Sequence, residues 1–93
     1  MNIETSNDFI YISETYTNPY FVLSYIPMLD LDITLVDCFM YSSKESYLNN
    51  SRYIHSFGSE VSNDIVFDDN QVTDSVISLL TEISPSTTFT KEN

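Results

Sequence analysis

Pairs of carboxylates are the feature of this sequence that could do chemistry. Asp30 and Asp32 alternate with apolar residues in "PMLDLDITLVD", and Asp68 and Asp69 are adjacent in "DDNQVTD". Paired carboxylates can bind a divalent cation, exchange a proton in acid–base catalysis, or present negative charge to a partner. The residues around the two pairs decide among these uses.

The ligands of a typical metal site are scarce. Segment 68–74 resembles a calcium loop only superficially, because Val72 stands at the fifth position and no glycine follows at the sixth. A magnesium site at the first carboxylate pair remains an alternative. The chain has one cysteine and one histidine, Cys38 and His55, which are too few for a zinc site.

Catalytic and phosphate-binding motifs are also missing. A dyad of Cys38 and His55 would require the two to be adjacent, and a cysteine in an apolar strand is more often a buried thiol. One glycine, Gly58, cannot form a phosphate-binding loop, and three basic residues are too few to bind nucleic acid. We therefore expect no enzymatic activity, no catalytic residue, no metal or other cofactor and no direct nucleic-acid binding.

Net charge is the strongest anomaly of the composition. The 93 residues include 14 Asp or Glu but only 3 Lys or Arg, which gives a net charge of −11. Six of the acids lie in residues 1–43 and six in residues 56–90, and neither segment contains a base. An anionic surface of this kind attracts cations, basic peptides or the nucleic-acid-binding faces of proteins.

Length and hydropathy indicate one globular domain. Hydrophobic residues make up 42% of the chain, with seven Tyr and six Phe, which is enough for a core. The single cysteine suits a reducing cytoplasm, and the chain shows neither a signal peptide nor an apolar run of about 18 residues. We expect a soluble cytoplasmic protein with one domain over residues 1–85 and a frayed tail over 86–93.

Three strands are expected in the first half. Segments 8–13 and 20–26 are β-rich and are predicted to pair antiparallel across a turn at 17–19, with Pro27 ending the second. A third strand is predicted at about 29–36, with Leu29, Leu31, Ile33 and Leu35 on its apolar face. Asp37 would fall on that face and indicates a bulge or the strand end.

Helices are expected in the second half. The capping-box spacing of Ser42 and Glu45 predicts a short helix starting near residue 43. "RYIHSF", before Gly58, and "DIVF" (64–67) are candidate strands. A C-terminal helix is predicted to start at a cap on Asp69 or Asn70 and to end before Pro85, with an apolar stripe of Val72, Val76, Leu79, Leu80 and Ile83. The predicted fold class is α+β, an antiparallel sheet of about three to five strands with one face covered by helix.

Local structure can account for about half of the acids. The carboxylates at 68, 69 and 74 lie near a helix start, Glu45 lies in a capping box, and those at 8 and 64 resemble turn formers. Asp30, Asp32 and Glu82 have no such explanation, because the first two occupy predicted strand positions and the third occupies the last turn of a helix. These choices suggest a role outside the fold.

The predicted spacing of these acids resembles that of phosphates. Residues i and i+2 of a strand lie ~6.8 Å apart, close to the roughly 6–7 Å between successive phosphates of DNA. Asp74 and Glu82 would lie ~12 Å apart along a helix. The candidate partner-binding carboxylates, as phosphate surrogates, are Glu14, Asp30, Asp32, Asp37, Glu60, Asp64, Asp68, Asp69, Asp74 and Glu82.

By its size, acidity and Asn/Ser/Tyr/Ile-rich composition, the whole chain resembles the small acidic anti-restriction proteins of bacteriophages. In particular it resembles the anti-restriction nuclease (Arn) family of T-even phages, which are DNA mimics. The resemblance rests on no motif. It implies a protein of the host cytoplasm that occupies the DNA site of a restriction nuclease such as McrBC, or of a nucleoid protein such as H-NS. It also implies a homodimer or higher oligomer.

A second function fits the same composition. An acidic protein can neutralise a basic partner that does not bind DNA, as an antitoxin neutralises a toxin. Competition with duplex DNA separates the two functions, because only a DNA mimic must exclude DNA from its partner.

Overall fold

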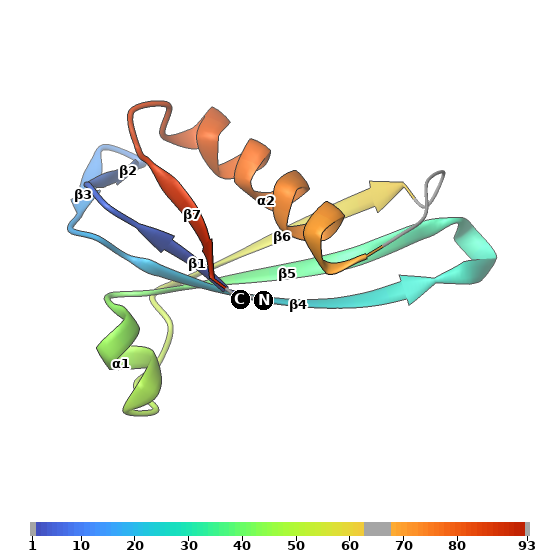
Figure 1. The fold of residues 1–93 in the computed structure, drawn as a ribbon, viewed down its shortest axis with the longest axis horizontal. Coiled ribbons are helices and arrows are strands. Elements are labelled where there is room, and N and C mark those ends of the chain that lie inside the picture. Colours follow the sequence, from blue (N-terminus) through green and yellow to red (C-terminus); the bar gives the residue numbers. More distant parts are fainter. Residues whose placement is uncertain (1, 63–67, 93) are drawn as a thin grey trace.

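The structure is a computed structural model that describes residues 2–62 and 68–92. The fold is α+β, as predicted, with a five-stranded antiparallel sheet in the order β6-β5-β4-β1-β7 and a separate two-stranded sheet (Figure 1). The five strands are β1 (Asn2–Thr5), β4 (Tyr20–Met28), β5 (Ile33–Tyr41), β6 (His55–Ser62) and β7 (Phe89–Glu92). The remaining elements are β2 (Phe9–Tyr11), β3 (Glu14–Tyr16), the 3-10 helix η1 (Leu29–Leu31), α1 (Lys44–Leu48) and α2 (Asp69–Ile83).

The longest strand pair is the β4–β5 hairpin, which is paired over nine residues of each strand. The predicted pairing of 8–13 with 20–26 is wrong, because β2 pairs with β3 while β4 lies between β1 and β5. Pro27 does not end β4. Strand β1 reaches only as far as Val22, so the rest of β4 is a sheet edge, where a residue without an N–H is tolerated.

The predicted strand at 29–36 is also wrong in its bounds and its register. Residues 29–31 form η1, and β5 passes through Asp37 without a break. The buried face of β5 carries Thr34, Val36, Cys38 and Met40, whereas Leu35 and Asp37 are exposed. A charged side chain in mid-strand would be expensive to bury, so Asp37 decides which face enters the core.

The C-terminal helix confirms the predicted apolar stripe. Val72, Val76 and Leu80 are buried against the sheet, and Leu79 and Ile83 are half-buried. The cap is one residue earlier than predicted, since Asp68 forms the capping box with Gln71. Figure 1 shows α2 lying across one face of the sheet.

Phe9 links β2 to the core beneath α2. Its ring makes edge-to-face contacts with Phe21, Phe57 and Phe89 at centroid distances of 5.2, 6.5 and 6.1 Å. Such aromatic pairs add about 0.5–1.5 kcal/mol each beyond their area burial. Phe9 therefore fixes the position of the small β2–β3 sheet relative to the large one.

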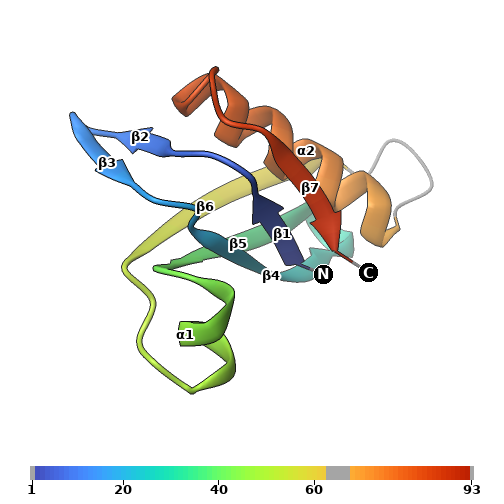
Figure 2. The same ribbon diagram turned by 60° about the vertical axis from the view of Figure 1, so that its left-hand side comes forward.

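Helix α1 lies on the opposite side of the sheet from α2 (Figure 2). Its N-cap is Ser43, which accepts a hydrogen bond from the backbone N–H of Ser46, so the predicted capping box at Ser42 and Glu45 is wrong. The ring of Tyr47 contacts those of Tyr20 and Tyr41 at 5.6 and 5.1 Å. This tyrosine cluster covers one end of the second sheet face.

The predicted frayed tail is wrong over Phe89–Glu92. These residues form β7, which pairs antiparallel with β1 over four residues and brings the two ends of the chain side by side (Figure 2). Thr87 is buried, and its hydroxyl donates to the carbonyl of Asp8 at 2.7 Å. The predicted strand "RYIHSF" is displaced, because β6 starts at His55 and continues through Gly58; the predicted strand 64–67 lies outside the described residues.

Candidate partner-binding surface

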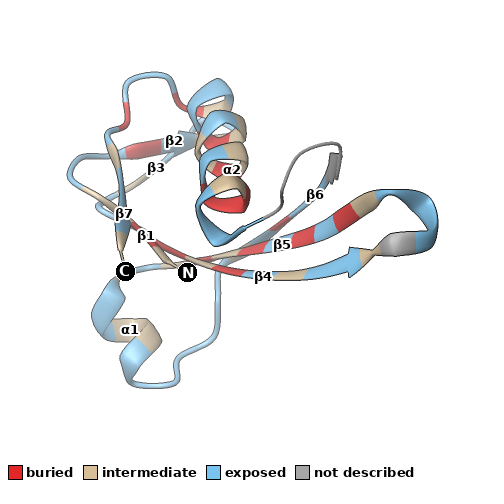
Figure 3. Cartoon of the chain, turned by 45° about the vertical axis from the view of Figure 1, so that its right-hand side comes forward, coloured by how far each residue is buried: buried red, intermediate tan, exposed pale blue. Residues whose placement is uncertain are grey.

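Strands β4, β5 and β6 project beyond the end of α2 as an arm along the longest dimension of the molecule, which is 38 Å (Figure 1). Figure 3 shows that exposed residues predominate towards the end of this arm. Six of the predicted carboxylates lie on it or beside it.

Asp30 and Asp32 lie at the tip of the arm. Asp30 is in η1, and Asp32 follows it with a φ of 54°, a conformation that Asp adopts more readily than most residues. The prediction that they alternate along a strand is therefore wrong, and the spacing of ~6.8 Å derived from it does not apply. Both side chains are exposed, and neither has a hydrogen bond or ion pair to any residue in the described ranges.

Asp37 and Glu60 lie on the open face of the arm, opposite α2. Asp37 pairs with Gly58 of β6, so Glu60 is its diagonal neighbour on the same face. Diagonal neighbours on adjacent strands lie ~7–8 Å apart, which is close to the roughly 6–7 Å between successive phosphates of DNA. Both carboxylates are exposed and have no hydrogen-bonding or ionic partner among the described residues.

A groove with both polar and apolar lining residues adjoins this carboxylate pair. It has a volume of about 590 Å³ and is lined by both carboxylates and by Ile26 and Leu35, which are 61% and 43% exposed. The groove does not follow from the sequence pattern, because that pattern places Leu35 on the buried face of the strand. An exposed apolar side chain opposite an acid on a sheet is a feature that a protein partner can contact.

Asp68 and Asp69 lie where α2 begins, close to the arm. Asp68 caps the helix by accepting a hydrogen bond from the N–H of Gln71 at 2.8 Å. Asp69 accepts one from the hydroxyl of Tyr25 on β4 at 2.7 Å, and this bond raises the pKa of that tyrosine. Together with the four carboxylates on the arm, these two form one set. We call the six carboxylates on or beside the arm the acidic arm: Asp30, Asp32, Asp37, Glu60, Asp68 and Asp69.

All three basic residues lie outside the acidic arm. Lys44 of α1 forms ion pairs with Glu92 at 2.7 Å and Glu4 at 3.4 Å, and the pKa of Glu92 falls to about 2 chiefly through its bond with Lys44. Arg52 lies in the loop after α1, and Lys91 lies in β7. The arm therefore carries negative charge with no Lys or Arg within it.

The remaining predicted carboxylates do not join the acidic arm. Asp74 forms an ion pair with Lys91 of β7 at 2.7 Å, so its charge is partly neutralised within the fold. Glu82 is exposed in the last turn of α2, at the end away from the arm, and Glu14 lies in β3. Asp64 lies outside the described residues.

Cys38 and His55 do not form a dyad. Burial of Cys38 raises its pKa to about 12, which leaves almost no thiolate at neutral pH. His55 instead has its Nε2 atom 2.8 Å from the hydroxyl oxygen of Tyr16. Over residues 2–62 and 68–92, no three His, Cys, Asp or Glu side chains gather closely enough to hold a metal ion.

Comparison of the chain with protein-family models, with curated proteins and with solved structures gives no match. Among the described helices, none has the length and apolar character required to cross a bilayer.

Charge repulsion should make the stability of the protein depend on salt. At ~10 mM ionic strength the Debye length is about 30 Å, which spans most of the molecule, and at ~200 mM it is below 10 Å. We expect the melting temperature to rise by roughly 5–10 °C over this range, measured by circular dichroism. A melting temperature that stays constant would show that the carboxylates do not repel one another in the folded state.

Proposed function

We propose that this protein is a DNA mimic that inhibits DNA-binding proteins by occupying their DNA site with the acidic arm. The observation that carries the proposal is the arm itself, where Asp30, Asp32, Asp37 and Glu60 are exposed and without partners in the described ranges. Lys44, Arg52 and Lys91 lie on other segments of the chain. A protein surface that binds phosphates requires such a set of unneutralised charges. By the resemblance noted above, the partners are a host restriction nuclease and a nucleoid protein.

Charge density favours an assembly of more than one copy. Duplex DNA as long as the 38 Å molecule carries about 22 charges, whereas the whole chain carries −11. Two copies placed end to end would extend the array of carboxylates over a longer stretch of a DNA-binding site. We therefore include a homodimer or higher oligomer in the proposal.

The groove on the open face favours a second candidate function. Ile26 and Leu35 are exposed beside Asp37 and Glu60, and duplex DNA presents no equivalent apolar side chains on its backbone. A basic protein that presents apolar residues between its charges would match this face, whether or not it binds DNA. The second candidate is therefore an acidic protein that neutralises a basic partner, as an antitoxin does.

Displacement by DNA tests the first function against the second. The protein is immobilised, exposed to bacterial lysate, and washed, and the bound proteins are then challenged with a 20-base-pair duplex. We expect the duplex to release the partner, because it competes for the same positively charged site. Polyglutamate at the same concentration of charge serves as the control for general screening and should release much less.

Each outcome of this experiment distinguishes the two candidates. A bound partner that the duplex does not displace, but that salt releases, supports the antitoxin-like function. Equal release by duplex and polyglutamate would mean that the acidic arm acts only through its net charge and does not imitate DNA.

A further inference from the structure

A second hollow, away from the acidic arm, combines aromatic rings with a carboxylate. It has a volume of about 410 Å³ and lies between the β2–β3 hairpin and the start of β6. This size is at the lower end of the ~300–1,000 Å³ typical of ligand pockets. The hairpin pocket, as we name it, is lined by Tyr11, Ile12, Glu14, Tyr16, Ile54 and His55.

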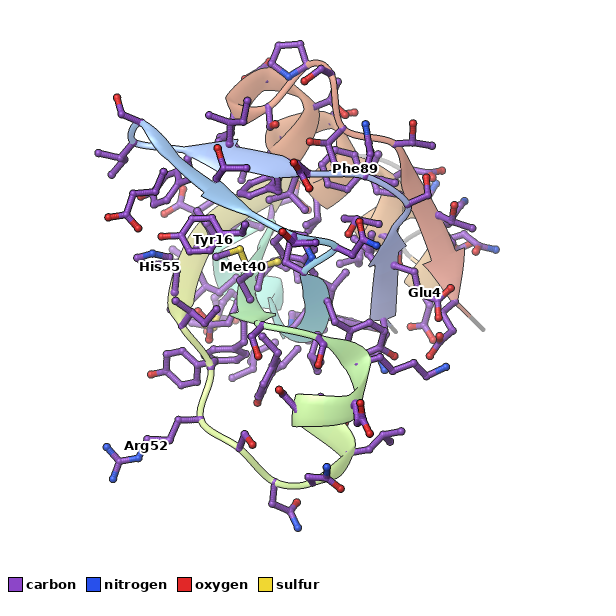
Figure 4. The ribbon with its side chains drawn as sticks, turned by 90° about the vertical axis from the view of Figure 1, so that its left-hand side faces the viewer. Glu4, Tyr16, Met40, Arg52, His55 and Phe89 are labelled. Atoms are coloured by element: carbon purple, nitrogen blue, oxygen red, sulfur yellow. The ribbon has the colours of Figure 1, made fainter. Side chains whose placement is uncertain are left out.

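The His55 ring of the hairpin pocket packs edge-to-face against two tyrosine rings. The His55 ring lies 5.2 Å from that of Tyr11 and 5.6 Å from that of Tyr16, at interplanar angles of 69° and 86°. Figure 4 shows Tyr16 and His55 next to one another at the edge of the molecule. None of the three residues is buried, so ring surface remains open to a ligand.

A hydrogen-bond chain holds the carboxylate of the pocket in place. The Tyr16 hydroxyl donates to Glu14 Oε2 at 3.1 Å and lies 2.8 Å from His55 Nε2. A hydroxyl has one proton to donate, so while it donates to Glu14 the histidine must donate from Nε2. Burial and the neighbouring Glu14 raise the pKa of Tyr16, which keeps its hydroxyl protonated at neutral pH.

The residues of the hairpin pocket match the chemistry of an arginine side chain. Aromatic faces attract a planar guanidinium, and a carboxylate can accept its N–H donors. Ile12 and Ile54 are 76% and 40% exposed and can cover the aliphatic part of the same side chain. A lysine ammonium is more strongly hydrated and does not stack, so it fits less well.

None of the basic residues of this chain occupies the pocket. Lys44 and Lys91 are engaged in ion pairs elsewhere, with Glu92 and Asp74. Figure 4 shows Arg52 projecting from its loop, away from Tyr16 and His55. A cation that binds there must therefore come from another molecule.

We propose that the hairpin pocket binds an arginine side chain presented by the basic protein partner. Only the origin of the arginine depends on the proposed function, because the pocket chemistry stands independently of the acidic arm. In the complex, this arginine would anchor the partner at one end of the molecule while the acidic arm meets its phosphate-binding surface at the other.

Titration of the full chain with N-acetyl-arginine amide tests the pocket directly. We expect the ring resonances of Tyr11, Tyr16 and His55 in the NMR spectrum to shift with saturable, millimolar affinity. The citrulline analogue has the same shape without the charge and should cause no saturable shift. The lysine analogue should bind more weakly than arginine.

Two matched variants test the role of the carboxylate. Glu14→Gln should weaken arginine binding by about fivefold or more, because Glu14 is the only acid among the described residues that line the pocket. Glu45→Gln makes the same change in net charge at another exposed site and should have no effect. Tyr16→Phe keeps the ring but releases Glu14, and should give an intermediate loss.

Three results would overturn the proposal that the pocket binds arginine. They are no saturable shift with the arginine amide, equal shifts with the citrulline analogue, or equal losses of arginine affinity in Glu14→Gln and Glu45→Gln. The proposed function is judged separately, by DNA displacement of a captured partner. Arginine binding without displacement of the partner by DNA would contradict the DNA-mimic function and support the arginine-binding pocket. Displacement by DNA without arginine binding would support the DNA-mimic function and contradict the pocket.

Discussion

Neutralising the four unpartnered carboxylates of the acidic arm together should weaken partner binding by about 100-fold, or ~2.7 kcal/mol. The variant combines Asp30→Asn, Asp32→Asn, Asp37→Asn and Glu60→Gln. Each exposed charge contact typically contributes about 0.2–1 kcal/mol. These four carboxylates have no hydrogen-bonding or ionic partner among the described residues, so a bound protein does not have to displace one. Binding is measured as the dissociation constant for a partner captured from lysate and released by duplex DNA.

The same four substitutions should leave the fold intact. All four side chains are exposed, and asparagine tolerates the positive φ of Asp32 at least as well as aspartate does. Removal of like charges should raise the melting temperature at low salt and reduce its dependence on salt. A variant that unfolds would show instead that these carboxylates stabilise the native state.

A matched pair of double variants separates position from net charge. Asp37→Asn with Glu60→Gln changes two acids on the open face of the arm. Asp8→Asn with Glu45→Gln changes the same residue types at exposed positions outside it. We expect a loss of about tenfold for the first pair and less than about twofold for the second. Equal losses would contradict the assignment of the arm as the binding surface.

The elements predicted correctly from the sequence are those whose patterns are local and long. The stripe of Val72, Val76 and Leu80 repeats over three turns, and a capping residue precedes it, so α2 follows from periodicity alone. The β-rich run after Pro19 likewise indicates β4. In both cases the signal lies within one element and needs no knowledge of its neighbours.

The predicted strand register was wrong because Asp30 and Asp32, which define its polar face, lie before β5, and within β5 the two faces look similar. Leu35 and Val36 are equally apolar, and alternation alone assigns either one to the core. Asp37 determines the register, because a strand that continues through it must have Leu35 and Asp37 facing solvent and Val36 facing the core. Treating Asp37 as a break in the strand removed that constraint and reversed the face.

Contacts between distant segments explain the other differences. Strands β1 and β7 have only four residues each, and most of these residues are polar. They nevertheless pair with each other, although they lie at opposite ends of the sequence. The partner of Asp74 is Lys91 on β7, which no helical spacing reveals. The neighbours Asp37 and Glu60 become visible only once the β5–β6 register is known. Sequence spacing therefore predicted the acidity of the surface, but not which carboxylates are free.

Removal of residues 89–93 should destabilise the protein by more than about 3 kcal/mol, with a fall of more than about 12 °C in melting temperature. The deletion removes the ladder between β1 and β7 and the contacts of Phe89 with Phe9 and Phe21 at 6.1 Å. It also leaves Lys44 without its closer carboxylate, Glu92, and Asp74 without its only ion-pair partner in the described ranges. Thermal and urea unfolding followed by circular dichroism measure the change.

Single substitutions on β7 show which contacts carry this effect. Phe89→Ala removes the half-buried ring beside Phe9 and should account for about 2 kcal/mol of the loss. Thr90→Ala lies next to it on the same strand, with an exposed side chain, and should change stability by less than about 0.5 kcal/mol. A truncated protein as stable as the full chain would mean that β7 is not held in solution. The edge of the sheet at β1 would then be open, and Phe9 would be held in the core by Phe21 and Phe57 without Phe89.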